Sequence, residues 1–250
     1  MVNLSLKQRI PPLENGDRLT RYEFERRYQA MPRHQKAELI EGVVYLASPL
    51  RFESHAEPHG HVIGWLWTYQ IATPGVRLGI EPTVRLDRDN EPQPDGVLLI
   101  TPTSQGQSRL SSDDYIEGAP ELVIEIAASS VAIDLHDKKK VYGRNGVKEY
   151  IVWQIFENKL DWFRLQQGEY VSLEVDADGI IKSQVFPGLW LSMSDLLAGN
   201  MPQVLAVLQL GLNSPEHQIF DEYLASVYFL GNETGAFDCT IPNNPAKRII

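Results

Sequence analysis

The chain has one cysteine, Cys239, among 250 residues, and this excludes an internal disulfide. A lone thiol fits a reducing compartment, so we expect a cytoplasmic protein. The amino terminus lacks the basic segment and apolar core of a signal peptide. No run of about eighteen apolar residues occurs, so we expect no membrane-spanning helix and no membrane partner.

An excess of basic residues is also lacking. Lysine and arginine number 23 against 33 acidic residues, which gives a net charge of −10. Such a chain is not expected to coat nucleic acid by bulk attraction. Any contact with DNA must therefore depend on a local basic patch and on metal ions.

Several catalytic motifs are absent. There is no Gly-x-Ser-x-Gly nucleophile elbow, no glycine-rich phosphate loop and no dinucleotide fingerprint. Cys239 lies in a stretch with little apolar periodicity, which is a poor position for a nucleophile. These absences disfavour serine and cysteine hydrolases, P-loop enzymes and dinucleotide-dependent enzymes.

The order of the expected elements predicts an α/β or α+β fold with a mixed sheet flanked by helices. Thr20 and Glu23 have capping-box spacing for a first helix. Further along we expect a hairpin over 37–47, a loop over 48–60, a helix over 62–73, a strand over 80–86 and a loop over 101–119. We expect one strand directly after Asp95, a second strand that contains Glu125, and a helix that begins near Asp134.

The same pattern predicts a domain organisation. We expect a leader over 1–19, a main domain over 20–191, a helical extension over 192–230 and a poorly ordered tail over 231–250. Ser214 and Pro215 are typical of the start of the last helix.

Two acids and a lysine carry the chemical signal. Asp95 stands at the mouth of one apolar strand, and Glu125 lies inside another. A carboxylate in an apolar strand is costly to bury unless it is paired, hydrogen-bonded or metal-bound. Lys138, on the following helix, returns toward both acids, and this set predicts a divalent-metal site that acts on phosphate. The structural alternative is that Asp95 caps a strand, Glu125 pairs with an arginine and Lys138 is solvated.

Other groups leave alternatives open. Glu38 is either a solvent-facing strand residue or a third acid of the site. The histidines His55, His59 and His61 suggest a zinc cluster, but Pro58 and Gly60 are expected to break the helix that would align the first two. The alternative is a histidine-rich loop with one residue on substrate phosphate.

The densest basic cluster lies next to the two acids. It contains Lys138, Lys139, Lys140, Arg144 and Lys148. A solvated helix face is the ordinary interpretation of such a run. In a chain this acidic, its position also suits a local phosphate-binding patch.

Four segments in this order resemble the Uma-two family of restriction-endonuclease-like proteins, within the PD-(D/E)xK nuclease superfamily. They read QPDGVLLI, PELVIEIAASS, DLHDKKKVY and NGVKEYIVW. The segment AELIEGVVYLASP and the residues after His59 extend the resemblance over roughly residues 20–190. It implies a restriction-endonuclease-like mixed sheet.

The resemblance also implies site roles. Asp95 takes the place of the motif aspartate and Glu125 that of the acidic position, and together they would bind the metal. Ala127 stands where the superfamily pattern has lysine, and Lys138 occupies the family's alternative lysine position. Glu38 and His59 resemble supporting site residues, and a backbone carbonyl near Ile126 could complete a metal shell.

These observations predict a DNA endonuclease that depends on Mg²⁺ or Mn²⁺, and the resemblance implies that it acts as a homodimer. The alternative is a nuclease-like fold that binds nucleic acid or a protein without cutting. The net charge of −10 and the missing lysine at position 127 favour that alternative. A carboxylate-pair hydrolase with another substrate is a more distant hypothesis.

Overall fold

The fold is organised around a six-stranded mixed sheet. The structure is a computed structural model that describes residues 10–32 and 35–233, with side chains to residue 227. The strand order is β11-β10-β9-β8-β5-β3, where only the β8–β9 pair is parallel. The bounds are β3 Val76–Ile80, β5 Gly96–Ile100, β8 Leu122–Ala127, β9 Glu149–Gln154, β10 Lys159–Gln166 and β11 Glu169–Ser172. The expected mixed sheet flanked by helices is confirmed.

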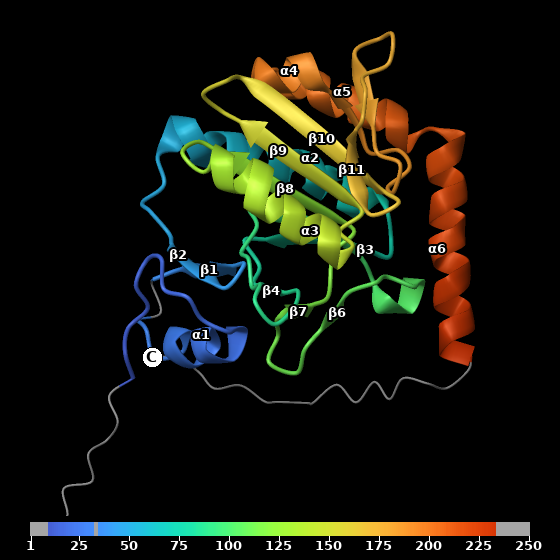
Figure 1. The fold of residues 1–250 in the computed structure, drawn as a ribbon. Helices are drawn as coiled ribbons and strands as arrows, with labels where there is room; N and C mark the ends of the chain where they lie inside the picture. Colours follow the sequence, from blue (N-terminus) through green and yellow to red (C-terminus); the bar gives the residue numbers. More distant parts are fainter. Residues whose placement is uncertain (1–9, 33–34, 234–250) are drawn as a thin grey trace, which may run out of the picture.

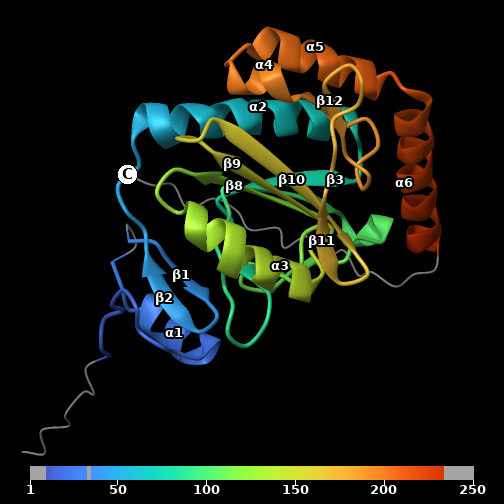
Figure 2. The same ribbon diagram turned by 45° about the horizontal axis from the view of Figure 1, so that its top comes forward.

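Side chains alternate between the two faces of the sheet, and the central strands are buried at every position. Each face is therefore covered by a helix. Ile124 and Ile126 of β8 face the core that contains α2 (Glu57–Ala72). Val123 and Ala127 face the second core, which contains α3 (Lys139–Asn145). Figures 1 and 2 show α2 and α3 on opposite faces of the sheet. Glu125 lies two residues after Val123 in the same strand, so its side chain points to the same face, toward α3.

The carboxyl-terminal helices extend the α2 side of the molecule. They are α4 (Met193–Leu197), α5 (Met201–Leu212) and α6 (Pro215–Glu233), and they follow the pair β12 (Ile180–Lys182) and β13 (Trp190–Ser192). Leu196, Val204 and Leu224 enter the same core as α2. As expected, Pro215 begins α6, and Ser214 Oγ accepts a hydrogen bond from His217 N. No helix in the described ranges has the length and apolarity needed to span a bilayer.

The amino-terminal segment lies at the end of the sheet away from α6 (Figures 1 and 2). It contains α1 (Arg21–Tyr28) and the hairpin of β1 (Ala37–Ile40) and β2 (Val43–Leu46). Glu41 and Gly42 have φ of 51° and 72°, which form the tight turn that the sequence predicts. Thr20 precedes α1 but makes no side-chain cap, and Glu23 pairs with Arg26 and Arg27, so the capping box that the sequence predicts does not form.

Three sequence expectations are wrong in this part of the chain. The predicted loop 48–60 contains a π-helical turn, Phe52–Ala56, that continues into α2, because this wider turn accommodates Pro58 at the start of α2. The predicted strand 80–86 is divided at Glu81, whose φ of 48° ends β3 before β4 (Val84–Arg85). The predicted loop 101–119 holds a short 3₁₀ turn, Pro102–Ser104, and the strands β6 (Arg109–Leu110) and β7 (Ile116–Glu117).

Helix α6 continues to Glu233, past the predicted start of the tail at residue 231. The rest of that predicted tail, 234–250, lies outside the described residues, as do residues 1–9 of the predicted leader.

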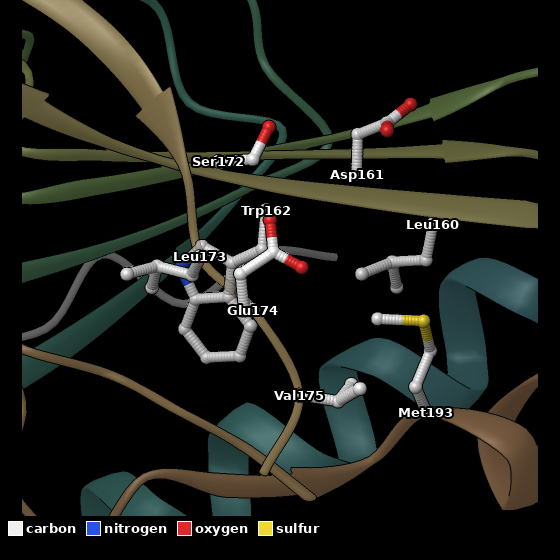
Figure 3. Close-up of a pocket in the computed structure, with 8 residues that line it drawn as sticks. All are labelled: Leu160, Asp161, Trp162, Ser172, Leu173, Glu174, Val175 and Met193. Atoms are coloured by element: carbon white, nitrogen blue, oxygen red, sulfur yellow. The ribbon is translucent and has the colours of Figure 1, made fainter. Parts of the chain in front are cut away.

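A hollow of about 250 Å³ lies where β10 meets α4 (Figure 3). Leu160, Trp162 and Met193 form its apolar wall, and Asp161 and Glu174 lie at its rim. It shares no residue with the acids and lysine predicted to form the site.

Candidate active site

Asp95 is fixed at the point where β5 enters the sheet. Gly96 pairs with Ile124 across the β5–β8 ladder, so Asp95 lies beside the second half of β8. Its Oδ2 accepts a hydrogen bond of 2.6 Å from the Ile126 N–H. The backbone of one strand thus orients a carboxylate that belongs to the other.

Glu125 is buried on the α3 side, with 4% of its surface exposed. Its Oε1 accepts hydrogen bonds from Lys138 Nζ at 3.0 Å and from the Tyr142 hydroxyl at 2.8 Å. Both donors come from the helical segment after β8, in which the π-helical turn Ile133–Lys138 leads directly into α3. The structural alternatives of an arginine partner for Glu125 and a solvated Lys138 are wrong.

Lys138 gathers two further carboxylates. Its Nζ lies 3.0 Å from Glu38 Oε1 and 3.5 Å from Asp134 Oδ1. Glu38 reaches the cluster from β1, and its Oε1 also accepts a hydrogen bond from Gln93 N. The open question about Glu38 is therefore answered: its side chain points toward the other acids.

Carboxyl groups outnumber the single lysine in this cluster. Burial, and then the neighbouring acids, raises the pKa of Glu125 well above its ordinary value. Burial alone would lower the pKa of Lys138, but Glu125, Glu38 and Asp134 hold it well above the usual range. Burial also raises the pKa of Asp134, whose Oδ1 is buried without a hydrogen-bond partner among the described residues. One lysine thus faces more carboxylates than it can neutralise.

Two histidines lie on the other side of Asp95. The expectation that Pro58 and Gly60 keep His55 and His59 apart is wrong, because the helix is continuous and their ring centroids are 5.6 Å apart. His59 Nε2 donates to the Asp95 carbonyl at 2.9 Å. His55 Nε2 lies 3.2 Å from Asp95 Oδ1, and this carboxylate raises the pKa of His55.

All five residues singled out from the sequence therefore meet at one end of the sheet: Asp95, Glu125, Lys138, Glu38 and His59. Sequence reasoning missed Asp134, Tyr142 and the contact of His55 with Asp95. The spacing of Asp134, Lys138 and Tyr142, four residues apart along one helical face, was the available signal.

The expected basic patch is not a continuous surface. Lys138 is buried, and Lys139 Nζ lies 3.4 Å from the centre of the Phe163 ring. Arg144 pairs with Glu41 and Asp87. These cations are largely engaged by the protein itself.

Position 127 holds an alanine where the superfamily pattern has lysine. Ala127 is fully buried against the α3 core. It faces the same side as Glu125, and Lys138 brings its ammonium group to that carboxylate from the helix instead.

The profile of the Uma2 family, described as "putative restriction endonuclease", matches residues 22–194. The chain belongs to the Uma2 family. Its membership supports a nuclease and confirms the resemblance inferred from the four sequence segments. No protein in the curated set matches the chain.

A solved structure with a similar fold supports the same assignment of architecture. It is a crystal structure of a "putative nuclease belonging to DUF820" from Anabaena variabilis. The identity is 17%, the TM-score is 0.52, and the match covers 69% of this chain and 96% of the other. At this identity the likeness shows the shared fold of this Uma2 chain and its neighbour.

Proposed function

We propose that this Uma2 protein is a metal-dependent DNA endonuclease of the PD-(D/E)xK type. The observation that supports it best is the buried contact of Lys138 with Glu125 and Glu38, next to the backbone-held carboxylate of Asp95. Burying one lysine among several acids costs stability, and such a group is often retained because it serves a function. Metal-dependent phosphodiester hydrolysis uses hard oxygen ligands with a nearby cation.

The residues present fit Mg²⁺ or Mn²⁺. Asp134 Oδ1 is buried without a hydrogen-bond partner in the described ranges, and acids outnumber the lysine in the cluster. A divalent cation would offset this excess negative charge. Asp95 and Glu125 would hold it, and the ion would polarise the phosphate and lower the pKa of the attacking water.

The chain's own groups perform the remaining tasks. Lys138 positions the attacking water or stabilises negative charge that develops on the phosphate. Glu38 orients Lys138 through their 3.0 Å contact. His59 orients the start of β5 through its bond to the Asp95 carbonyl.

The substrate and assembly follow from the same proposal. DNA is the substrate, and a homodimer would present one site to each strand of a duplex. Leu210 on α5 and Ile219 on α6 are exposed apolar residues on the helices we propose as the interface. Light scattering of the purified protein at micromolar concentration should give the mass of a dimer, and a monomer would contradict this part.

The direct test is cleavage of supercoiled and linear DNA with Mg²⁺ or Mn²⁺. Wild type should cut only with metal, and Asp95→Asn should lower the rate by about 100-fold or more. Asp178→Asn makes the same chemical change in an exposed turn and should cut like wild type. Equal cutting by Asp95→Asn and wild type would contradict the proposal.

One observation favours a second candidate, a binding module that does not cut. Glu125 and Lys138 are in contact within a nearly closed cluster, with 4% and 5% of their surfaces exposed. DNA binding without cleavage under every metal condition, with no effect of Asp95→Asn on the affinity, would favour this candidate.

A further inference from the structure

A group of three potential ligands lies beside the acid–lysine cluster. One ligand atom from each of His55, His59 and Asp95 lies within 4.8 Å of the other two. The histidines come from the helical segment at the start of α2, and Asp95 comes from the start of β5. The backbone positions of all three residues are therefore set by a helix and the start of a strand before any ion binds.

The His55 imidazole and the Asp95 carboxylate face each other. His55 Nε2 lies 3.2 Å from Asp95 Oδ1, and the two side chains are 12% and 14% exposed. A nitrogen and a carboxylate oxygen at this separation suit two ligands of one ion. A cation bound to both atoms would need little movement of either side chain.

The His59 imidazole is held by a bond common among metal ligands. Metal-binding histidines often donate their other ring N–H to a carbonyl, which fixes the tautomer. Because a carbonyl oxygen only accepts, the 2.9 Å contact with Asp95 O makes Nε2 the donor. The lone pair is then on Nδ1, in the neutral form that binds metals.

The donor set decides which ions suit this group. Mg²⁺ and Ca²⁺ prefer oxygen ligands, whereas imidazole suits first-row transition metals. We propose that His55, His59 and Asp95 bind one divalent transition metal ion of the series Mn²⁺ to Zn²⁺ in preference to Mg²⁺. Three protein ligands leave positions open for water or a phosphate oxygen. The proposal rests on the proposed function in that Asp95 belongs to both sites.

Metal titration of untagged protein tests this site without measuring cleavage. Co²⁺ binding is followed by its visible absorption, and Zn²⁺ binding by calorimetry in excess Mg²⁺. Wild type should bind one ion, and His55→Gln should weaken binding by about tenfold or more. His61→Gln is the matched control, because His61 lies outside the three-residue group, and it should bind like wild type.

His59→Gln gives a second test if His55→Gln does not fold, as judged by circular dichroism. No binding of Co²⁺ or Zn²⁺ by wild type would overturn the proposal and would leave His55 as a simple partner of Asp95. Equal binding by wild type and both folded variants would also overturn it.

Transition-metal binding that needs His55, without DNA cleavage under any condition, would support this site and contradict the proposed function. Mg²⁺-dependent cleavage that is unchanged in His55→Gln, without transition-metal binding, would do the reverse.

Discussion

Glu125 and Glu149 are buried carboxylates on the adjacent parallel strands β8 and β9, but they have opposite surroundings. Glu149 accepts hydrogen bonds from Trp162 Nε1, Ser183 Oγ and the N–H groups of Gln184 and Val185. Glu125 has Lys138 and Tyr142 as donors and further acids as neighbours.

The difference separates a structural acid from one suited to function. One donor to Glu149, Trp162, lies on β10, and the others lie between β12 and β13. This carboxylate therefore holds the segment between β12 and β13 against the sheet. The donors of Glu125 do not offset the nearby negative charge. Because stability alone does not require such an excess, we interpret the Glu125 cluster as a ligand site.

The largest effect on stability is expected for Lys138→Met. This change leaves Glu125, Glu38 and Asp134 without their common cation and should lower the free energy of unfolding by about 3–5 kcal/mol near neutral pH. Urea unfolding measures it. Adding Glu125→Gln to the same chain should recover part of the loss, and a double variant no more stable than Lys138→Met would contradict the excess-charge interpretation.

Glu149→Gln should have the next largest effect. The amide group replaces one acceptor oxygen and faces donors such as Ser183 Oγ or Gln184 N, so about 3 kcal/mol of stability should be lost. Unlike changes in the Glu125 cluster, this loss should be the same with and without added metal. A variant as stable as wild type would contradict the structural role of Glu149.

Glu91 provides a third kind of buried acid and a pH test. Burial, and then Glu25, raises the pKa of Glu91 from 4.5 to about 8. The native protein therefore keeps a proton that the unfolded chain releases above about pH 4.5. This contribution to stability is complete below about pH 4.5 and is lost as the pH rises through about 8.

Urea unfolding of wild type and Glu91→Gln between about pH 5 and about pH 9 measures this contribution. The variant should show a smaller decline in stability across the range. Parallel declines would exclude Glu91 as the group that binds the proton.

The smallest effect on stability is expected for Glu125→Gln. The side-chain oxygen can still accept from Lys138 and Tyr142, and one charge of the excess is removed. Without metal, the free energy of unfolding should stay within about 1 kcal/mol of wild type or rise. A loss as large as that of Glu149→Gln would mean that the two acids do not differ.

Much of the fold and site could be predicted because local rules and strand patterns agree. The hairpin turn at Glu41-Gly42 and the start of α6 at Pro215 follow from local backbone preferences. Asp95 and Glu125 stand out because each interrupts or begins an apolar strand. Their adjacency requires only that the two strands pair.

The errors occur where a local signal had two structural meanings. Proline normally interrupts a helix, but Pro58 lies in the first turn of α2, so the π-helical turn before it keeps His55 aligned with His59. Periodicity could not orient Glu38, because its direction depends on how the β1–β2 hairpin meets Lys138. The basic run after Asp134 predicted a patch, but side-chain partners far along the chain neutralise Arg144.

The most direct test of the functional role of Glu125 is cleavage of supercoiled DNA with Mn²⁺ or Mg²⁺ by Glu125→Gln, once its stability is known to match wild type. Our account predicts a folded protein that cuts about 100-fold more slowly or not at all. Cleavage at the wild-type rate would show that Glu125, like Glu149, is a structural acid, and would contradict the assignment of the metal site.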